Sequence, residues 1–296
     1  VSSEGTLALE PAKPHAVAFD HVTFGYGAAE TNALTDVSLD LPAGSLTAFV
    51  GPSGAGKTTA AQLIPKFWET RQGAVRIDGH ALSELRTDNL MDLVSFVFQE
   101  AFMLDDTLYE NIRLGRPNAT REQVEAAARA AQIHDTIEGL PNGYDTLLGE
   151  NGVKLSGGER QRVCIARAIL KDAPIIVFDE ATSFTDIENE HRIQLALSHL
   201  LTNKTCIMIA HRLHTIVHAD QILVRVGGKV VERGVHEELL AADGHYAALW
   251  RSQQVDALEK ALLVEGAAMR GAAAGPQEAD GEAEPNGADS RESEER

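Results

Sequence analysis

The chain has 296 residues, 44% hydrophobic and 24% charged, a globular composition that excludes a wholly disordered or fibrous protein. Its 26 basic and 44 acidic residues give a net charge of −18, which argues against nucleic-acid binding because such a surface needs an excess of Lys and Arg. Two cysteines can build neither a disulfide framework nor a zinc cluster, and they favour a reducing compartment.

Both ends of the chain differ from its middle. Residues 1–14 show no periodic pattern and are predicted to be a linker. Residues 256–296 are predicted to hold the end of the last helix and a disordered acidic tail, because the chain after Glu265 is rich in Ala, Gly and acids and lacks aromatic residues. No apolar run approaches the roughly 18 residues that a membrane helix needs, so the chain itself is not expected to cross a membrane.

Between these ends, predicted strands alternate with predicted helices. Strands are predicted at 16–24, 37–41, 46–50, 74–78, 94–98, 175–179, 205–210, 222–226 and 229–232. Helices are predicted from the Gly-rich turn after residue 50 to Ile64, over much of 107–140, and over 159–170, 188–201 and 246–263. This alternation indicates an α/β fold with a mostly parallel sheet covered on both faces, and the helix-rich stretch 100–170 is predicted to form a lobe of its own.

The clearest motif follows the buried strand 46–50. It fits the pattern G-x-x-x-x-G-K-[ST] and reads Gly51-Pro52-Ser53-Gly54-Ala55-Gly56-Lys57-Thr58-Thr59. Backbone amides of such a turn and the start of the next helix bind phosphate oxygens. We expect Lys57 to reach the β- and γ-phosphates of a nucleotide and Thr58 to hold Mg²⁺, whereas the bland interpretation is a turn that only joins strand to helix.

A second candidate lies where the apolar strand 175–179 ends in two acids. Ligands sit at the carboxyl ends of strands in a doubly wound sheet. Asp179 is therefore predicted to bind Mg²⁺, and Glu180 to polarise the attacking water as a catalytic residue. The alternative is a solvated acidic turn.

The segment before the helix 159–170 identifies a family. It reads Leu155-Ser156-Gly157-Gly158-Glu159-Arg160-Gln161-Arg162, with Ser156 as a helix N-cap and a second site of exposed amides. Together with the phosphate loop, it resembles the ATP-binding cassette (ABC) ATPases over residues 15–255. The resemblance implies a P-loop NTPase fold with a RecA-like core, an antiparallel β subdomain and an α-helical subdomain inserted at about 100–170.

The same resemblance implies roles for further residues. Tyr26 looks like the aromatic residue that stacks on adenine, and Gln99 matches the glutamine that touches Mg²⁺ and attacking water. His211 matches the catalytic switch histidine that contacts the γ-phosphate. Asp186 matches the aspartate of the D-loop, although Phe184 and Thr185 before it depart from the family pattern.

In this family two subunits enclose ATP. The signature of one, here Ser156, Gly157, Gly158 and Glu159, covers ATP held by the phosphate loop of the other. The implied cofactors are ATP and Mg²⁺, and the implied partner is a second nucleotide-binding domain. No required residue is missing, so active hydrolysis is expected, with Lys57, Glu180 and His211 as the catalytic set.

The run Gly149-Glu150-Asn151-Gly152 resembles the exporter-type branch, in which a transmembrane domain precedes the cassette. The chain is therefore expected to be an excised domain that powers transport at the cytoplasmic face of the inner membrane. A separate permease is the alternative, and the run 183–190 also resembles cassettes of siderophore and iron importers that share the exporter fold. Two other classes stay open: a soluble ABC ATPase of translation or DNA repair, and a non-hydrolysing nucleotide-gated module.

Overall fold

The computed structural model describes residues 5–27, 31–149, 155–179 and 187–255. Val1–Arg251 form one compact unit and Ser252–Arg296 a second. Of the second unit the structure describes residues 252–255, which are helical. The predicted acidic tail lies outside the described residues.

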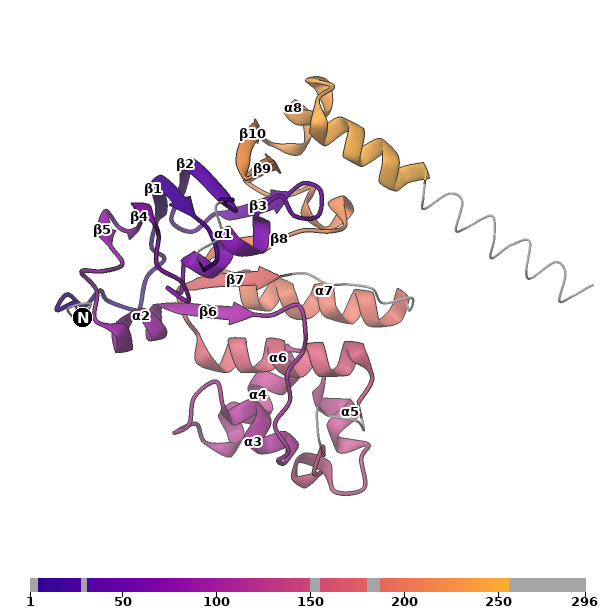
Figure 1. The fold of residues 1–296 in the computed structure, drawn as a ribbon. Coiled ribbons are helices and arrows are strands. Elements are labelled where there is room, and N and C mark those ends of the chain that lie inside the picture. The colour runs from indigo at the N-terminus through magenta and orange to yellow at the C-terminus, as the bar shows by residue number, and fades with distance from the viewer. Residues whose placement is uncertain (1–4, 28–30, 150–154, 180–186, 256–296) are drawn as a thin grey trace, which may run out of the picture. The chain divides into compact units, whose positions relative to one another are not determined.

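Two sheets build the first unit (Figure 1). The antiparallel sheet has the order β2 (Leu34–Leu41), β1 (Val17–Phe24), β4 (Gln72–Ile77), β5 (His80–Ala81). The larger sheet has the order β10 (Lys229–Gly234), β9 (Gln221–Val226), β3 (Leu46–Val50), β8 (Thr205–Ile209), β7 (Ile175–Asp179), β6 (Val94–Val97). It is parallel except for the β9–β10 hairpin. The predicted α/β fold with an antiparallel β subdomain is confirmed.

The helices lie before, between and after these strands. They include α1 (Lys57–Leu63), α2 (Thr87–Leu93), α3 (Leu108–Arg113), α4 (Arg121–Ala130), α5 (His134–Glu138), α6 (Gly157–Lys171), α7 (Ile187–Leu201) and α8 (His236–Ala241), and residues 245–251 are also helical. The short elements β5, α2 and α8 carry too few residues to show a periodic pattern and had no counterpart in the sequence prediction.

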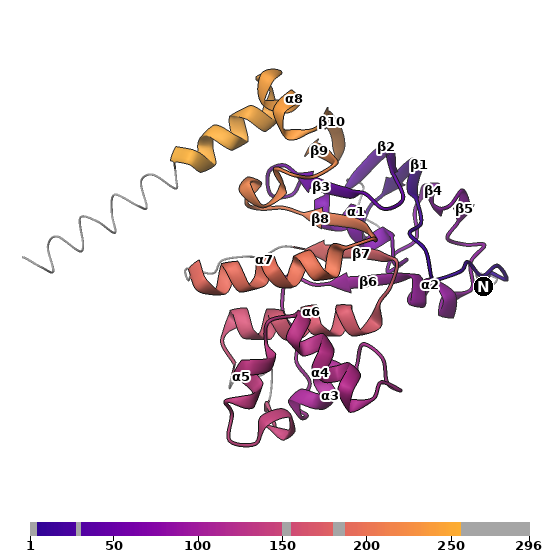
Figure 2. The same cartoon turned by 180° about the vertical axis from the view of Figure 1, so that it is seen from behind.

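The larger sheet is buried on both faces. Along β3, Phe49 packs into one apolar cluster with α1 and the antiparallel sheet, whereas Ala48 and Val50 pack into the other cluster with α6 and α7. This alternation follows from the two-residue period of a strand, and burial on both sides explains why these strands are continuous apolar runs. Figure 2 shows from behind that α6 and α7 run along one side of the sheet, with α3, α4 and α5 beyond α6.

The helical insertion was predicted as one helix-rich stretch, and it contains the short helices α3, α4 and α5 and most of the longer α6. Thr120 begins α4 with a capping box, and Gln132 adopts a left-handed conformation just after the helix ends. Buried side chains of α4, α5 and α6, among them Val124 and Ile137, belong to the same apolar cluster as one face of the large sheet. The insertion therefore belongs to the first compact unit.

Residues 5–14, predicted as a linker, are hydrogen-bonded to the segment that follows β5 and to α2. The backbone of Leu9 exchanges two hydrogen bonds of 2.8 and 2.9 Å with the side chain of Asn89. The buried ring of His15 lies 2.7 Å from a carboxylate oxygen of Asp78. These contacts hold residues 9–15 against the rest of the first unit.

Candidate nucleotide-binding site

Parallel pairing brings the predicted site to one edge of the large sheet. Ile209 of β8 is in register with both Phe49 of β3 and Asp179 of β7. The phosphate loop, Asp179 and His211 therefore leave the sheet side by side, as expected for the carboxyl ends of parallel strands.

The phosphate loop is a tight turn that depends on its glycines. Gly51, Gly54 and Gly56 have φ values of 139°, 76° and 81°, which side chains with a Cβ rarely adopt. A Cβ at Gly51 would overlap the carbonyl oxygen of Arg225, whereas Gly54 faces open space. The loop is thus pressed against β9 at its start and open at its centre, where Ser53 is also exposed.

Lys57 begins α1 and its side chain folds back over the loop. Its ammonium donates hydrogen bonds to the carbonyl oxygens of Gly51, at 2.7 Å, and Pro52, at 2.9 Å. The residue is only 6% exposed. Burial lowers the pKa of Lys57, the charge of Asp179 opposes that effect, and the charge of Arg225 adds to it.

Asp179 has the properties of a metal ligand. The residue is 3% exposed, and its Oδ1 has no hydrogen-bond partner in the described part of the chain. Burial raises its pKa, while a hydrogen bond from Thr58 and the charges of His211 and Lys57 lower it. A buried carboxylate oxygen without a partner beside a threonine hydroxyl fits Mg²⁺, which binds a few protein oxygens and completes its shell with phosphate and water.

His211 lies at the same edge and is exposed. Partial desolvation of the ring and repulsion by Lys57 lower its pKa, and attraction by Asp179 opposes both. The neutral imidazole is therefore favoured near pH 7, where it can either donate or accept a hydrogen bond. Three predicted residues, Lys57, Asp179 and His211, thus act on one another electrostatically across the edge of the sheet.

Tyr26 and Gln99 lie at the margins of this edge. The Tyr26 ring is 42% exposed, meets Trp68 edge-on at 5.3 Å, and its hydroxyl lies 3.0 Å from the hydroxyl of Thr59 in α1. The predicted adenine-stacking residue is therefore joined to the helix that follows the phosphate loop. Gln99 follows β6 and is exposed.

The signature segment begins α6 away from these contacts. The Ser156 hydroxyl accepts a hydrogen bond from the backbone N–H of Glu159, and the Glu159 carboxylate accepts one from the Ser156 N–H at 2.7 Å, a complete capping box. Ser156 is exposed, Gly157 half-buried and Gly158 buried. Within the described ranges, no hydrogen bond or ion pair joins this segment to the phosphate loop.

Several predicted residues lie outside the described residues. They are Glu180, the D-loop Asp186 with Phe184 and Thr185 before it, and the run 150–152.

Two groups near the site were missed by the sequence analysis. Arg225 lies fully buried on β9 beneath the phosphate loop, and the only sequence signal was a cation inside the apolar run 222–226. Glu190 of α7 binds Arg212 at 2.8 Å and His214 at 3.0 Å, so it ties α7 to the segment that carries His211. Burial would raise the pKa of Glu190, but the hydrogen bonds from these two partners hold it below its ordinary value.

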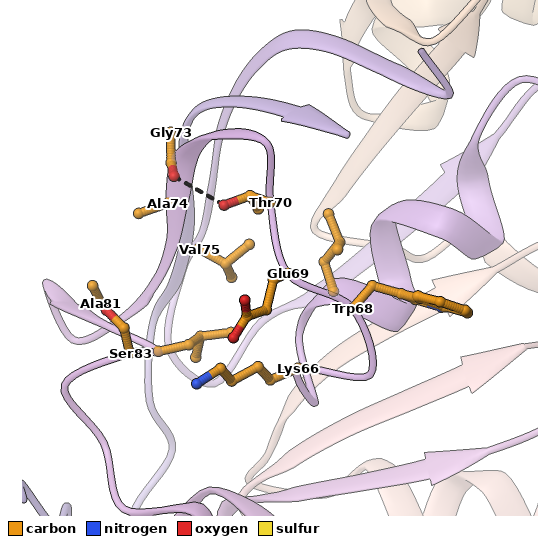
Figure 3. Close-up of a pocket in the computed structure, with 11 residues that line it drawn as sticks. Lys66, Trp68, Glu69, Thr70, Gly73, Ala74, Val75, Ala81 and Ser83 are labelled. Atoms are coloured by element: carbon orange, nitrogen blue, oxygen red, sulfur yellow. Dashed lines mark hydrogen bonds between the residues drawn. The ribbon is translucent and has the colours of Figure 1, made fainter. Parts of the chain in front are cut away.

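A separate hollow of about 250 Å³ opens where the chain leaves α1 and meets β4 and β5 (Figure 3). Its lining includes Lys66, Trp68 and Glu69 together with Val75 of β4. None of the residues predicted to bind phosphate or metal lines it. Over the described ranges, no helix is long and apolar enough to span a bilayer, and no three His, Cys, Asp or Glu side chains are grouped to hold a metal by themselves.

Comparison with known proteins gives consistent matches. The family model described as ABC transporter matches residues 34–183. The mycobactin import ATP-binding/permease protein IrtA of Mycobacterium tuberculosis is 52% identical over 246 residues, 83% of this chain and 28% of IrtA. An ATP-dependent lipid A-core flippase of Legionella pneumophila is 48% identical over 248 residues, 84% of this chain and 42% of the flippase.

Among solved structures, a bacterial Atm1-family ABC exporter with ATP bound matches with a TM-score of 0.79 at 43% sequence identity. The match covers 86% of this chain and 44% of the exporter chain. The chain therefore spans less than half the length of each of these relatives.

Proposed function

Because the chain belongs to the ABC transporter family and carries its ATP-binding ATPase domain, we propose that it dimerises around two ATP molecules and powers transport by a membrane domain of exporter fold. The observation that carries the proposal is the convergence of Lys57, Thr58, Asp179 and His211 on one edge of the sheet, with an unpaired carboxylate oxygen among them. Phosphoryl transfer to water needs positioning and charge neutralisation more than covalent chemistry, and this set can supply both.

Each residue has a definite task in this proposal. Lys57 exchanges its two loop carbonyls for phosphate oxygens of ATP, so its ammonium passes from neutral acceptors to anionic ones. Thr58 and Asp179 would hold Mg²⁺, which when bound neutralises charge on the β- and γ-phosphates. His211 donates a hydrogen bond to the γ-phosphate from its neutral ring, and Glu180 accepts a proton from the attacking water.

The proposed dimer follows from the position of the signature. Ser156 is exposed at the start of α6, so its hydroxyl and the first amides of the helix can reach an anion held by another subunit. ATP bound between two subunits then links them, and loss of the γ-phosphate weakens the link.

The membrane domain is proposed to cover an exposed aromatic surface formed by Phe67, Phe98 and Phe102. Phe67 and Phe98 stack at 5.9 Å, and Phe102 is 59% exposed. Phe98 and Phe102 line a hollow of about 270 Å³ between the large sheet and α6. Aromatic residues left in contact with solvent around a hollow mark an interaction surface, and Gln99 lies within the same segment.

We place the domain at the cytoplasmic face of the inner membrane, the side on which ATP is available, in agreement with its two free cysteines. Siderophore import is the second candidate, and the likeness to IrtA supports it. The likeness to a lipid A-core flippase is nearly as strong, so the proposal extends to transport and not to a substrate.

The test uses Glu180→Gln, with the exposed Glu138→Gln as a control that makes the same charge change. We expect Glu180→Gln to bind ATP, hydrolyse it at least about a hundredfold more slowly, and elute as a dimer in Mg²⁺–ATP by size exclusion with light scattering. Glu138→Gln should behave like the unmodified chain. A Glu180→Gln protein that hydrolyses normally, or stays monomeric at saturating ATP, contradicts the proposal.

A further inference from the structure

A buried cation lies beneath the phosphate loop. Arg225 belongs to β9, between β3 and the β10 hairpin, and its exposed fraction is 0%. The other residues of β9 are apolar, except Gln221 at the start of the strand. A guanidinium at such a position is unusual because charged side chains are almost never fully buried unless paired.

The charge of Arg225 is poorly compensated. Its Nε donates to the carbonyl oxygen of Ala55 and its Nη2 to that of Gly228, both at the long distance of 3.4 Å. Its Nη1 is buried without a hydrogen-bond partner, and no carboxylate of the described chain forms an ion pair with it. Burial lowers the pKa of Arg225 to about 10, still above neutral pH, so the group remains a cation.

The guanidinium touches the phosphate loop from below. Ala55, whose carbonyl it binds, is the centre of the loop, and the position of a Cβ at Gly56 would lie 3.5 Å from Nη2. The backbone of the same residue packs against Gly51 so closely that only glycine fits there. Arg225 therefore contacts the first, middle and last parts of the turn that precedes Lys57.

Two cations thus contact the backbone of the same loop. Lys57 is bonded to the Gly51 and Pro52 carbonyls and Arg225 to that of Ala55, and the charge of Arg225 repels that of Lys57. An uncompensated buried charge destabilises a protein unless a counter-charge arrives. The anion that can supply this counter-charge to both groups is the polyphosphate that the loop is proposed to bind.

We propose that Arg225 is a positioning residue of the nucleotide site, a buried cation that holds the phosphate loop from below and is charge-compensated by the polyphosphate of the bound nucleotide. The inference rests on the proposed nucleotide-binding role of the loop and adds to it a residue of β9 that lies outside the loop motif. Nucleotide affinity then depends on the charge at position 225, and more strongly for ligands with more phosphate charge.

The experiment measures ATP, ADP and adenosine affinities by calorimetry in EDTA, so that no metal contributes, on the 296-residue chain and on Arg225→Met, Arg225→Lys and Arg225→Gln. We expect Arg225→Met to bind ATP about tenfold more weakly than the unmodified chain does, to lose less affinity for ADP than for ATP, and to bind adenosine with unchanged affinity. Its ATP binding should also depend less on salt concentration. Arg225→Lys should retain ATP affinity within about threefold, because it keeps the charge.

A purely structural role predicts different results. Arg225→Met replaces an unpaired buried charge with an apolar side chain of similar length, so its thermal unfolding temperature without nucleotide should not fall below that of the unmodified chain. Leu223→Met, a buried neighbour on the same strand and in the antiparallel-sheet cluster, is the matched control for repacking and should bind all three ligands normally.

The proposal is overturned if folded Arg225→Met binds ATP as the unmodified chain does, or if it loses affinity for adenosine and ATP equally. If Arg225→Met does not fold, the ATP affinities of Arg225→Gln and Arg225→Lys compare a neutral with a charged side chain at the same position. Lys57→Ala separates this inference from the proposed function: loss of ATP binding there with normal binding in Arg225→Met refutes the role of Arg225 alone.

Discussion

The ammonium of Lys57 is the most direct point at which to perturb the site. It is almost fully buried, faces Asp179 across the edge of the sheet, and is held by only two carbonyl oxygens of the loop that it is proposed to exchange for phosphate. Lys57→Ala removes the charge and both hydrogen bonds while keeping a good helix former at the start of α1.

The size of the effect follows from these contacts. Hydrogen bonds to charged groups contribute about 1.5–3 kcal/mol each, so the loss of two bonds to phosphate weakens binding by at most about 3–6 kcal/mol, since the two bonds to carbonyls are given up when ATP binds. That free energy corresponds to an increase of roughly 10²- to 10⁴-fold in the Kd for ATP. Because Lys57 is shielded from solvent, salt should reduce this difference only slightly.

The assay is calorimetric titration with ATP, with circular dichroism to establish that the variant is folded. Lys229→Ala is the matched control, since it removes the same charge from an exposed position on β10. It should leave the Kd for ATP unchanged. A folded Lys57→Ala protein that binds ATP as tightly as Lys229→Ala would refute the assignment of the phosphate loop.

Three further predictions concern the signature, the segment that carries His211, and the phosphate loop. Ser156→Arg should leave ATP binding by the monomer intact and abolish turnover; normal turnover argues against signature action across an interface. Glu190→Gln should lower the free energy of unfolding by less than about 1 kcal/mol at pH 7. Folding lowers the pKa of Glu190, so its contribution to stability is present above the ordinary value of 4.5 and is lost as pH falls through the folded pKa. The urea midpoints of the variant and the unmodified chain should therefore converge in acid. A gap between the midpoints that stays constant with pH would exclude this linkage. Gly51→Ala should lower the free energy of unfolding by at least about 2 kcal/mol, because its Cβ would overlap the Arg225 carbonyl. Gly54→Ala should lower it by less, because a Cβ there would face open space. Equal decreases for the two variants would contradict the packing argument.

Local sequence determined the strands that form the centre of the fold. The runs 46–50 and 175–179 coincide with β3 and β7, because strands buried on both faces are continuous apolar segments bounded by turn residues or acids. The phosphate loop and the cap of α6 could also be predicted from local sequence, because their glycines, lysine and serine act on the nearby backbone.

Sequence reasoning reached its limit where the outcome depended on distant neighbours. Strand β2 begins at Leu34, earlier than predicted, because the additional residues are stabilised by antiparallel pairing with β1. The helix α2 was missed, since its buried side chains are few and their burial comes from packing rather than from a periodic pattern.

The sequence by itself thus determined most of the strands, the residues that are proposed to bind phosphate and metal, and the family to which the chain belongs. Only the tertiary structure decided that β9 runs beside β3, which places the guanidinium of Arg225 under a loop about 170 residues earlier in the chain. The physical reason is that a motif acts through backbone conformation within a few residues, whereas burial of a charge is a property of the strands packed around it.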